Sequence, residues 1–162
     1  MAIMAEKRTH LNLYQVNARI LLHELSASSG RKMTLGDVPE ADLDRWAGLG
    51  FDIVWLLGVW QTGEAGRRIA LSHEGLRREM KAVLPDLQDE DIAGSPFAVQ
   101  AYRVHEDMGG EPALLLLRER LAARGIRLVL DFVPNHVAVD HAWSRTHPEY
   151  FIAGTEAERA LQ

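Results

Sequence analysis

Three polar side chains that could do chemistry directly follow an apolar segment. Asp131, Asn135 and His136 stand at or just beyond the end of residues 126–133, which are almost all apolar and rich in β-branched side chains. Such a run is typical of a strand in a parallel sheet that is buried on both faces. In parallel α/β folds, ligands bind and reactions occur at the carboxyl ends of the strands. The sequence therefore predicts a functional site at the end of this strand.

The residue types alone leave three interpretations of these side chains open. Asp131 and Asn135 could hydrogen-bond the backbone of an ordinary loop. Together with Asp140 and His141 they could bind a divalent metal, although the spacing matches no stringent ligand motif. They could also bind a sugar, because planar carboxylate and amide groups make bidentate hydrogen bonds to hydroxyls. Trp143 or an aromatic residue of another loop would then supply a stacking face.

The elements that must position this site alternate between strands and helices. Strands are predicted around 14–19 and over 51–57 and 126–133. Helices are predicted from residue 37 or 39 to 48 or 50, and over 113–124 with Gly125 ending the second. Residues 72–84 have helical spacing, whereas 58–68 and 85–96 are predicted loops. Alternation of this kind predicts βαβ units and a parallel sheet, in either an open sheet or a barrel.

Composition excludes several classes of partner and site. The net charge is −5 with acids and bases interspersed, which argues against nucleic-acid binding. The chain has no cysteine, so disulfides and thiolate metal sites are excluded. No segment approaches the roughly 18 apolar residues of a membrane span, and the charged residues 6–8 precede no apolar core of a secretory signal. We therefore expect a soluble, cytoplasmic protein with no membrane partner.

Three segments resemble the α-amylase superfamily of glycoside hydrolases. Residues 131–136, Asp-Phe-Val-Pro-Asn-His, resemble the signature Asp-x-Val-x-Asn-His at the end of the third barrel strand. Residues 50–55 look like the second-strand pattern Gly-x-x-x-Ile-Trp, and 94–102 resemble Gly-Tyr-x-x-x-x-Tyr with Phe97 at the first aromatic position. The resemblance implies an α/β fold, namely a partial (β/α)8 TIM barrel with about the first three strands and two barrel helices.

The resemblance also implies roles for individual residues in binding an α-glucan or a small α-glucoside. Asp131 would hold the hydrogen-bond network under the sugar next to the cleaved bond, and His136 would donate a hydrogen bond to that sugar. Phe97 would stack on the sugar, and Tyr102 would bind substrate or support the loop. Asn135 would be a calcium ligand, as it is in many members, and calcium is the one cofactor that the resemblance implies.

The catalytic carboxylates of that family have no counterpart in this sequence. Retaining glycosidases need two carboxyl groups about 5 to 5.5 Å apart, and the family's nucleophile lies in a segment like Gly-x-Arg-x-Asp, which does not occur after His136. We therefore predict no catalytic residue in this chain.

A barrel of this type needs about 250 residues, so the 162 residues are expected to be an N-terminal fragment of the catalytic domain. The insertion after the third strand would begin at about 137–162. The expected protein is part of a retaining α-glycosidase or transglycosidase, inactive alone, that self-associates through exposed sheet edges. Two alternatives remain: a non-catalytic sugar-binding or interaction protein on the same barrel, and an unrelated metal-dependent hydrolase.

Overall fold

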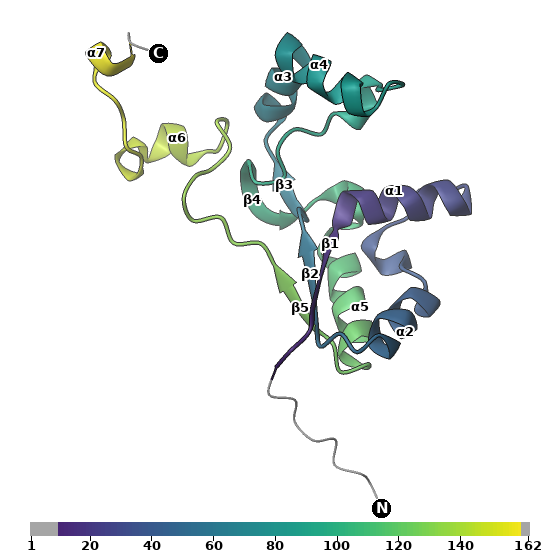
Figure 1. Cartoon of the computed structure of the whole chain (residues 1–162). Coiled ribbons are helices and arrows are strands. Elements are labelled where there is room, and N and C mark those ends of the chain that lie inside the picture. Colours follow the sequence, from purple (N-terminus) through teal and green to yellow (C-terminus); the bar gives the residue numbers. More distant parts are fainter. Residues whose placement is uncertain (1–9, 160–162) are drawn as a thin grey trace, which may run out of the picture. The chain divides into compact units, whose positions relative to one another are not determined.

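A three-stranded parallel sheet forms the centre of the first of two structural units. The computed structural model describes residues 10–159, and the predicted absence of a signal at residues 1–8 lies outside them. The strands β1 (Leu13–Asn17), β2 (Ile53–Leu57) and β5 (Arg127–Leu130) pair in the order β1-β2-β5 (Figure 1). In register, Leu13 lies beside Ile53 and Ile53 beside Arg127. All three strands thus end at the same edge, as the alternation predicted.

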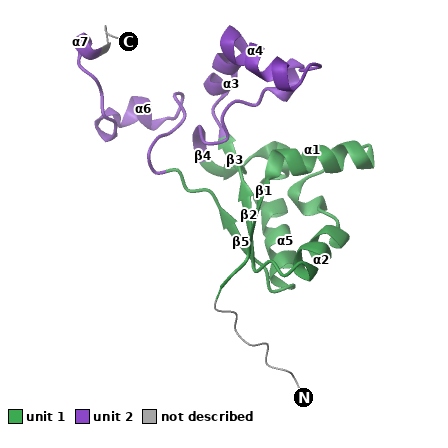
Figure 2. Cartoon of the chain, in the orientation of Figure 1, with its two compact units in different colours: residues 1–61, 102–133 green, residues 62–101, 134–162 purple. Residues whose placement is uncertain are grey.

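Unit 1 comprises residues 1–61 and 102–133, and unit 2 comprises residues 62–101 and 134–162 (Figure 2). The short strands β3 (Trp60–Thr62) and β4 (Val99–Val104) pair in a second sheet. The prediction of a loop over 58–68 is therefore wrong, because β3 and the beginning of the helix Glu64–Ser72 fall within it, and β4 was not predicted. Three residues are too few for a periodic pattern, and β4 carries polar and aromatic residues on an open surface.

Helices cover one face of the parallel sheet. They are α1 (Ala18–Ser29), α2 (Glu40–Gly48) and α5 (Gly110–Ala122), with the short 3-10 turns η1 (Leu35–Asp37) and η3 (Glu106–Met108) between them. Their apolar sides meet the sheet in one core, which includes the fully buried residues Leu43, Trp46, Val54, Leu56, Leu117, Leu121 and Ile126. Helix α5 ends before Gly125, whose φ of +75° is the left-handed conformation that glycine adopts without strain.

The predicted strand around 14–19 is shorter than expected, because a helix begins inside it. Asn17 ends β1, and its side-chain Oδ1 accepts hydrogen bonds from the backbone N–H groups of Arg19 and Ile20. This cap satisfies two of the free N–H groups at the start of α1. The apolar run 18–22 therefore belongs to a helix that the sequence analysis missed, because a short apolar run suits a buried strand and a buried helix equally well.

No element of unit 1 covers the opposite face of the sheet, so the prediction of a strand buried on both faces is wrong within this unit. Leu13 is 47% exposed and Val129 39% exposed, whereas Val54 and Leu56, which point to the helices, are fully buried. The physical reason is that α1, α2 and α5 all pack on one side (Figure 1).

Polar side chains tie the covering elements of unit 1 together. Arg120 on α5 donates hydrogen bonds to the backbone oxygens of Gly36 and Val38 and to the carboxylate of Glu40. Asp37 accepts hydrogen bonds from the backbone N–H (2.9 Å) and hydroxyl (2.6 Å) of Thr34 and pairs with Arg31. These donors stabilise the carboxylate and lower the pKa of Asp37 to about 2.

Unit 2 contains the remaining helices. They are α3 (Glu64–Ser72), α4 (Glu74–Val83), α6 (Trp143–Thr146) and α7 (Glu156–Arg159), with 3-10 turns η2 (Asp89–Asp91) and η4 (Pro148–Tyr150). A small core of Ala70, Leu87 and Ile92 holds α3 and α4 against the turn η2. Within residues 10–159, no helix is both long and apolar enough to cross a bilayer.

Candidate functional site

The carboxylate of Asp131 is the centre of the candidate site. It follows β5 directly and is the one buried charged side chain among residues 10–159, with 7% exposure. Its Oδ2 accepts a hydrogen bond from the backbone N–H of Gly58 at 2.6 Å, and its Oδ1 accepts one from Trp55 Nε1 at 2.8 Å. Both donors come from β2 or the residue after it, so neighbouring parallel strands hold the carboxylate at their carboxyl edge.

Trp55 is more than a core residue. Its indole N–H is a donor to Asp131, and its ring is half-buried rather than enclosed. Gly58 has a φ of +81°, a conformation that few side-chain-bearing residues adopt, and this turn directs its N–H at the carboxylate. A glycine after a strand indicates a turn in the sequence, but nothing local shows that its N–H would bind Asp131, 73 residues away.

An aromatic surface adjoins the buried carboxylate within unit 1. Trp60 donates from Nε1 to the backbone oxygen of Asp131 at 2.8 Å, and its ring meets Tyr102 edge-on at 5.3 Å between centroids. Tyr102 in turn lies 6.0 Å from Phe132, whose side chain is 76% exposed. We name Trp60, Tyr102 and Phe132 the aromatic surface. Tyr102 and Phe132 are exposed and Trp60 is half-buried, so this surface presents aromatic ring faces to solvent.

Tyr102 also fixes the backbone that leaves β5. Its hydroxyl accepts a hydrogen bond from the N–H of Val133 at 2.8 Å and donates one to the Val133 oxygen at 3.2 Å. The prediction placed Tyr102 at substrate or in support of a loop, and this contact supplies the support. Because the hydroxyl is engaged with the Val133 backbone, the part of Tyr102 that can contact a ligand is its ring face. The residue is 48% exposed.

The other predicted site residues belong to unit 2. Phe97 lies in a turn before β4 and is 38% exposed, a position open to stacking. Asn135 and His136 are exposed, and their side chains make no hydrogen bond or ion pair within residues 10–159. The five predicted residues are thus divided between the units, with Asp131 and Tyr102 in unit 1.

The segment just after His136 is anchored inside unit 2. Ala138 is 1% exposed, and its N–H donates to the oxygen of Val99 in β4. Asp140 Oδ2 accepts from the N–H of Ala65 in the first turn of α3 at 3.0 Å, where a helix N-terminus favours a carboxylate. A Cβ on Gly63 would stand 1.9 Å from Asp140 Oδ1, so only glycine leaves room for this contact.

The described residues do not assemble a calcium site around Asn135. Calcium takes six to eight oxygen ligands, usually with several carboxylates. Residues 10–159 contain no group of three acidic or histidine side chains close enough to share a metal ion. The amide of Asn135 therefore has no carboxylate cluster to join among these residues.

This arrangement can position a ligand by hydrogen bonds to Asp131. A carboxylate has about four lone-pair sites, and the two N–H donors occupy two of those on Asp131. The others can accept hydrogen bonds from hydroxyl groups beside the aromatic surface. Retaining cleavage of a glycosidic bond uses two carboxyl groups about 5 to 5.5 Å apart, and Asp131 is the one buried carboxylate among the described residues.

Comparison with known proteins agrees with this geometry. A profile of the α-amylase catalytic domain matches residues 41–159. The chain belongs to the α-amylase family. Its strands and covering helices are accordingly part of that family's (β/α)8 barrel, as the motif at residues 131–136 predicted.

The curated relatives of this α-amylase family chain include glucan transferases. An α-1,4-glucan:maltose-1-phosphate maltosyltransferase of Arcanobacterium haemolyticum is 30% identical over 118 residues, which are 69% of this chain and 15% of that protein. The enzyme of the same name from Cereibacter sphaeroides is 28% identical over 108 residues, or 64% of this chain and 14% of its own length. The chain therefore spans about one seventh of these relatives.

Solved structures of amylases resemble the fold. An α-amylase of Lactobacillus plantarum has a TM-score of 0.63 and 27% identity, and a maltogenic α-amylase of Thermotoga neapolitana has a TM-score of 0.60 and 25% identity. Each match covers 90% of this chain and 28% of the amylase. The proteins that this chain resembles thus include both amylases and maltosyltransferases.

Proposed function

We propose that this chain is the sugar-positioning part of a retaining α-glycosidase or transglycosidase that acts on α-linked glucosyl carbohydrates. The observation that carries the proposal is the buried Asp131 carboxylate, held by Trp55 and Gly58 beside an exposed aromatic surface. A carboxylate accepts hydroxyl hydrogen bonds and aromatic rings receive the apolar face of a pyranose. This combination suits a carbohydrate better than an ionic or purely apolar ligand.

In this proposal Asp131 and His136 bind sugar hydroxyls, and Phe97 with Tyr102 supplies stacking faces. Residues 1–162 are the N-terminal part of the barrel, with the insertion after the third strand beginning at about 137–162. The reacting carboxylates are not supplied by this chain, so it does not hydrolyse α-glucosides by itself. The predicted cytoplasmic location belongs to the same proposal.

Self-association follows from the uncovered face and edges of the sheet. β1 and β5 are the outer strands of the parallel sheet. Leu13 on β1 and Val129 on β5 expose apolar side chains on its uncovered face. Unpaired strand edges and apolar sheet faces favour association with other chains. Sedimentation velocity should therefore show oligomers, and a monodisperse monomer that melts cooperatively would contradict this part of the proposal.

A titration followed by NMR tests the sugar site. Maltotriose should shift the indole N–H signals of Trp55 and Trp60, whereas cellotriose, with β-linkages, should shift them less at equal concentration. Tyr102→Leu should weaken the maltotriose effect, because it removes a ring of the aromatic surface. Tyr150→Leu is the matched control, since Tyr150 is also exposed, at 61%, but belongs to unit 2.

The outcomes separate the parts of the proposal. Absence of any shift with maltotriose, or equal weakening by both tyrosine variants, refutes the sugar site. Measurable release of p-nitrophenol from p-nitrophenyl α-glucoside by the purified chain refutes the claim that it is inactive alone.

A further inference from the structure

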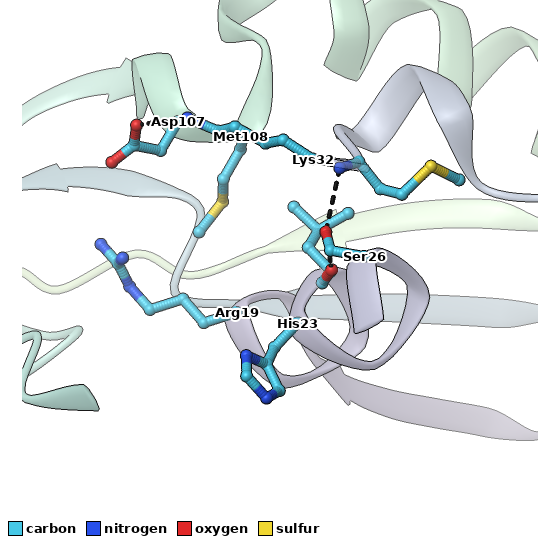
Figure 3. A pocket seen from close by; sticks show the side chains of 8 residues that line it. Arg19, His23, Ser26, Lys32, Asp107 and Met108 are labelled. Carbon is cyan, nitrogen blue, oxygen red and sulfur yellow. Dashed lines mark hydrogen bonds and ion pairs between the residues drawn. The ribbon is translucent and has the colours of Figure 1, made fainter. Parts of the chain in front are cut away.

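A pocket with a charged rim lies in unit 1, formed by elements that the proposed sugar site does not use. It has a volume of 210 Å³ and is formed by α1, the segment before η1, and η3 (Figure 3). Leu22, Met33 and Met108 are its buried apolar floor, each less than 10% exposed. Arg19, Lys32 and Asp107 carry the charges of its lining.

The rim holds more positive than negative charge. Lys32 Nζ pairs with Asp107 Oδ1 at 2.7 Å, so these two charges offset each other. The half-buried guanidinium of Arg19 makes no hydrogen bond and no ion pair within 4 Å inside the described part of the chain. Burial lowers the pKa of Arg19, and the attraction of Asp107 opposes that shift. A partly desolvated cation without a paired anion is a binding group for an anionic ligand.

Asp107 is held so that one of its oxygens remains available. The backbone N–H of Asp107 donates to Nδ1 of His105 at 3.2 Å, and Oδ2 of Asp107 lies 3.6 Å from the same ring nitrogen. Burial, together with the charge of Arg19, lowers the pKa of His105 and so favours the neutral imidazole. With Nδ1 acting as an acceptor, Oδ2 receives no hydrogen bond from that nitrogen.

The remaining polar lining groups do not compete for a ligand. The Ser26 hydroxyl donates to the oxygen of Leu22 at 2.6 Å and accepts from the N–H of Met33 at 2.9 Å. In Figure 3 the ring of His23 points away from the Lys32–Asp107 pair, whereas Arg19 extends on the side of Asp107. A ligand in this pocket therefore meets two cationic donors and one carboxylate acceptor.

We propose that this pocket binds a phosphate group that retains at least one proton, either inorganic phosphate or the phosphate of a phosphorylated metabolite. Arg19 and Lys32 donate to its unprotonated oxygens, and Asp107 accepts the hydrogen of its P–O–H group. Phosphate monoesters lose their second proton at about pH 6, so the required form is present near that pH. Sulfate carries no proton there, and Asp107 repels it. The inference does not depend on sugar binding.

The test is a calorimetric titration of the whole chain at about pH 6 with inorganic phosphate, glucose 1-phosphate and sulfate. We expect phosphate to bind at least about tenfold more tightly than sulfate, because a charge-assisted hydrogen bond is replaced by repulsion between like charges. Tighter binding of glucose 1-phosphate than of phosphate identifies a phosphorylated sugar as the ligand, and equal binding identifies free phosphate.

Variants make the proposal falsifiable. Arg19→Gln should weaken the binding of phosphate about tenfold or more. Arg31→Gln, which breaks an ion pair outside the pocket, should leave the affinity for phosphate unchanged. Asp107→Asn keeps the fold, because Asp107 is 63% exposed, and it should remove most of the preference for phosphate over sulfate. Equal binding of both anions by the unaltered chain, equal weakening by the two arginine variants, or no saturable phosphate binding would overturn it.

Discussion

Replacing Asp131 by Asn tests whether its carboxylate holds the edge of the sheet together. The carboxylate accepts from the N–H of Gly58 at 2.6 Å and from the indole of Trp55 at 2.8 Å. An amide of the same shape has one oxygen, so its NH₂ group must face one of these donors. The substitution therefore breaks one hydrogen bond, leaves a buried N–H unpaired and weakens the other bond.

The magnitude follows from opposing contributions. Losing two hydrogen bonds to a charged acceptor costs about 1.5 to 3 kcal/mol each, and the unpaired donor adds about 1 to 3 kcal/mol. One neutral hydrogen bond restores about 1 kcal/mol, and removing a buried charge that lacks a cationic partner recovers several kcal/mol of desolvation. We expect a net loss of about 2 kcal/mol in the free energy of unfolding.

Urea denaturation followed by far-UV circular dichroism at neutral pH measures this loss. Trp55→Phe removes one donor and should cost about 1 kcal/mol. Asp131→Asn should cost less in the Trp55→Phe background than alone, because the two side chains share a bond. Asp86→Asn, at an exposed carboxylate, should stay within about 0.5 kcal/mol of the unaltered chain. A loss below about 0.5 kcal/mol for Asp131→Asn, or strict additivity with Trp55→Phe, would refute the reasoning.

Three further predictions concern the scaffold, each measured by urea denaturation. Gly63→Ala should cost about 1 to 3 kcal/mol, because its Cβ would overlap a carboxylate oxygen at 1.9 Å. Gly48→Ala, with no atom within 4 Å of the new Cβ, should be neutral or stabilising, and a similar loss at both glycines contradicts the steric argument. Arg120→Met should cost about 2 kcal/mol by leaving backbone oxygens without donors, whereas exposed Arg118→Met should not. Hydrogen bonds lower the pKa of Asp37 to about 2. The stabilisation from its carboxylate is therefore complete above the pKa of Asp37 in the unfolded chain, about 4, and is lost as the pH falls toward 2. The loss of stability in Asp37→Asn should therefore shrink between pH 6 and pH 3, and a difference that does not change with pH contradicts it.

The sequence by itself determined the helices α2 and α5, the positions of β2 and β5, and the family. Each of these depends on local chemistry. Pro39 immediately precedes the first residue of α2, Gly125 follows α5 with a left-handed φ, and the segment 131–136 carries its motif within six consecutive residues. Local patterns of this kind are present before the chain folds, so they can be read without coordinates.

Only the tertiary structure decided what surrounds the predicted side chains. Trp55 and Asp131 are 76 residues apart in sequence, and neither gives a local sign of the hydrogen bond between them. Lys32 and Asp107, which form the rim of the pocket, are separated by 75 residues. The uncovered face of the sheet is equally non-local, because it depends on which side α1, α2 and α5 pack against. Residue type and spacing name the groups that can react or bind, but the pairing of distant strands and helices decides which of them meet.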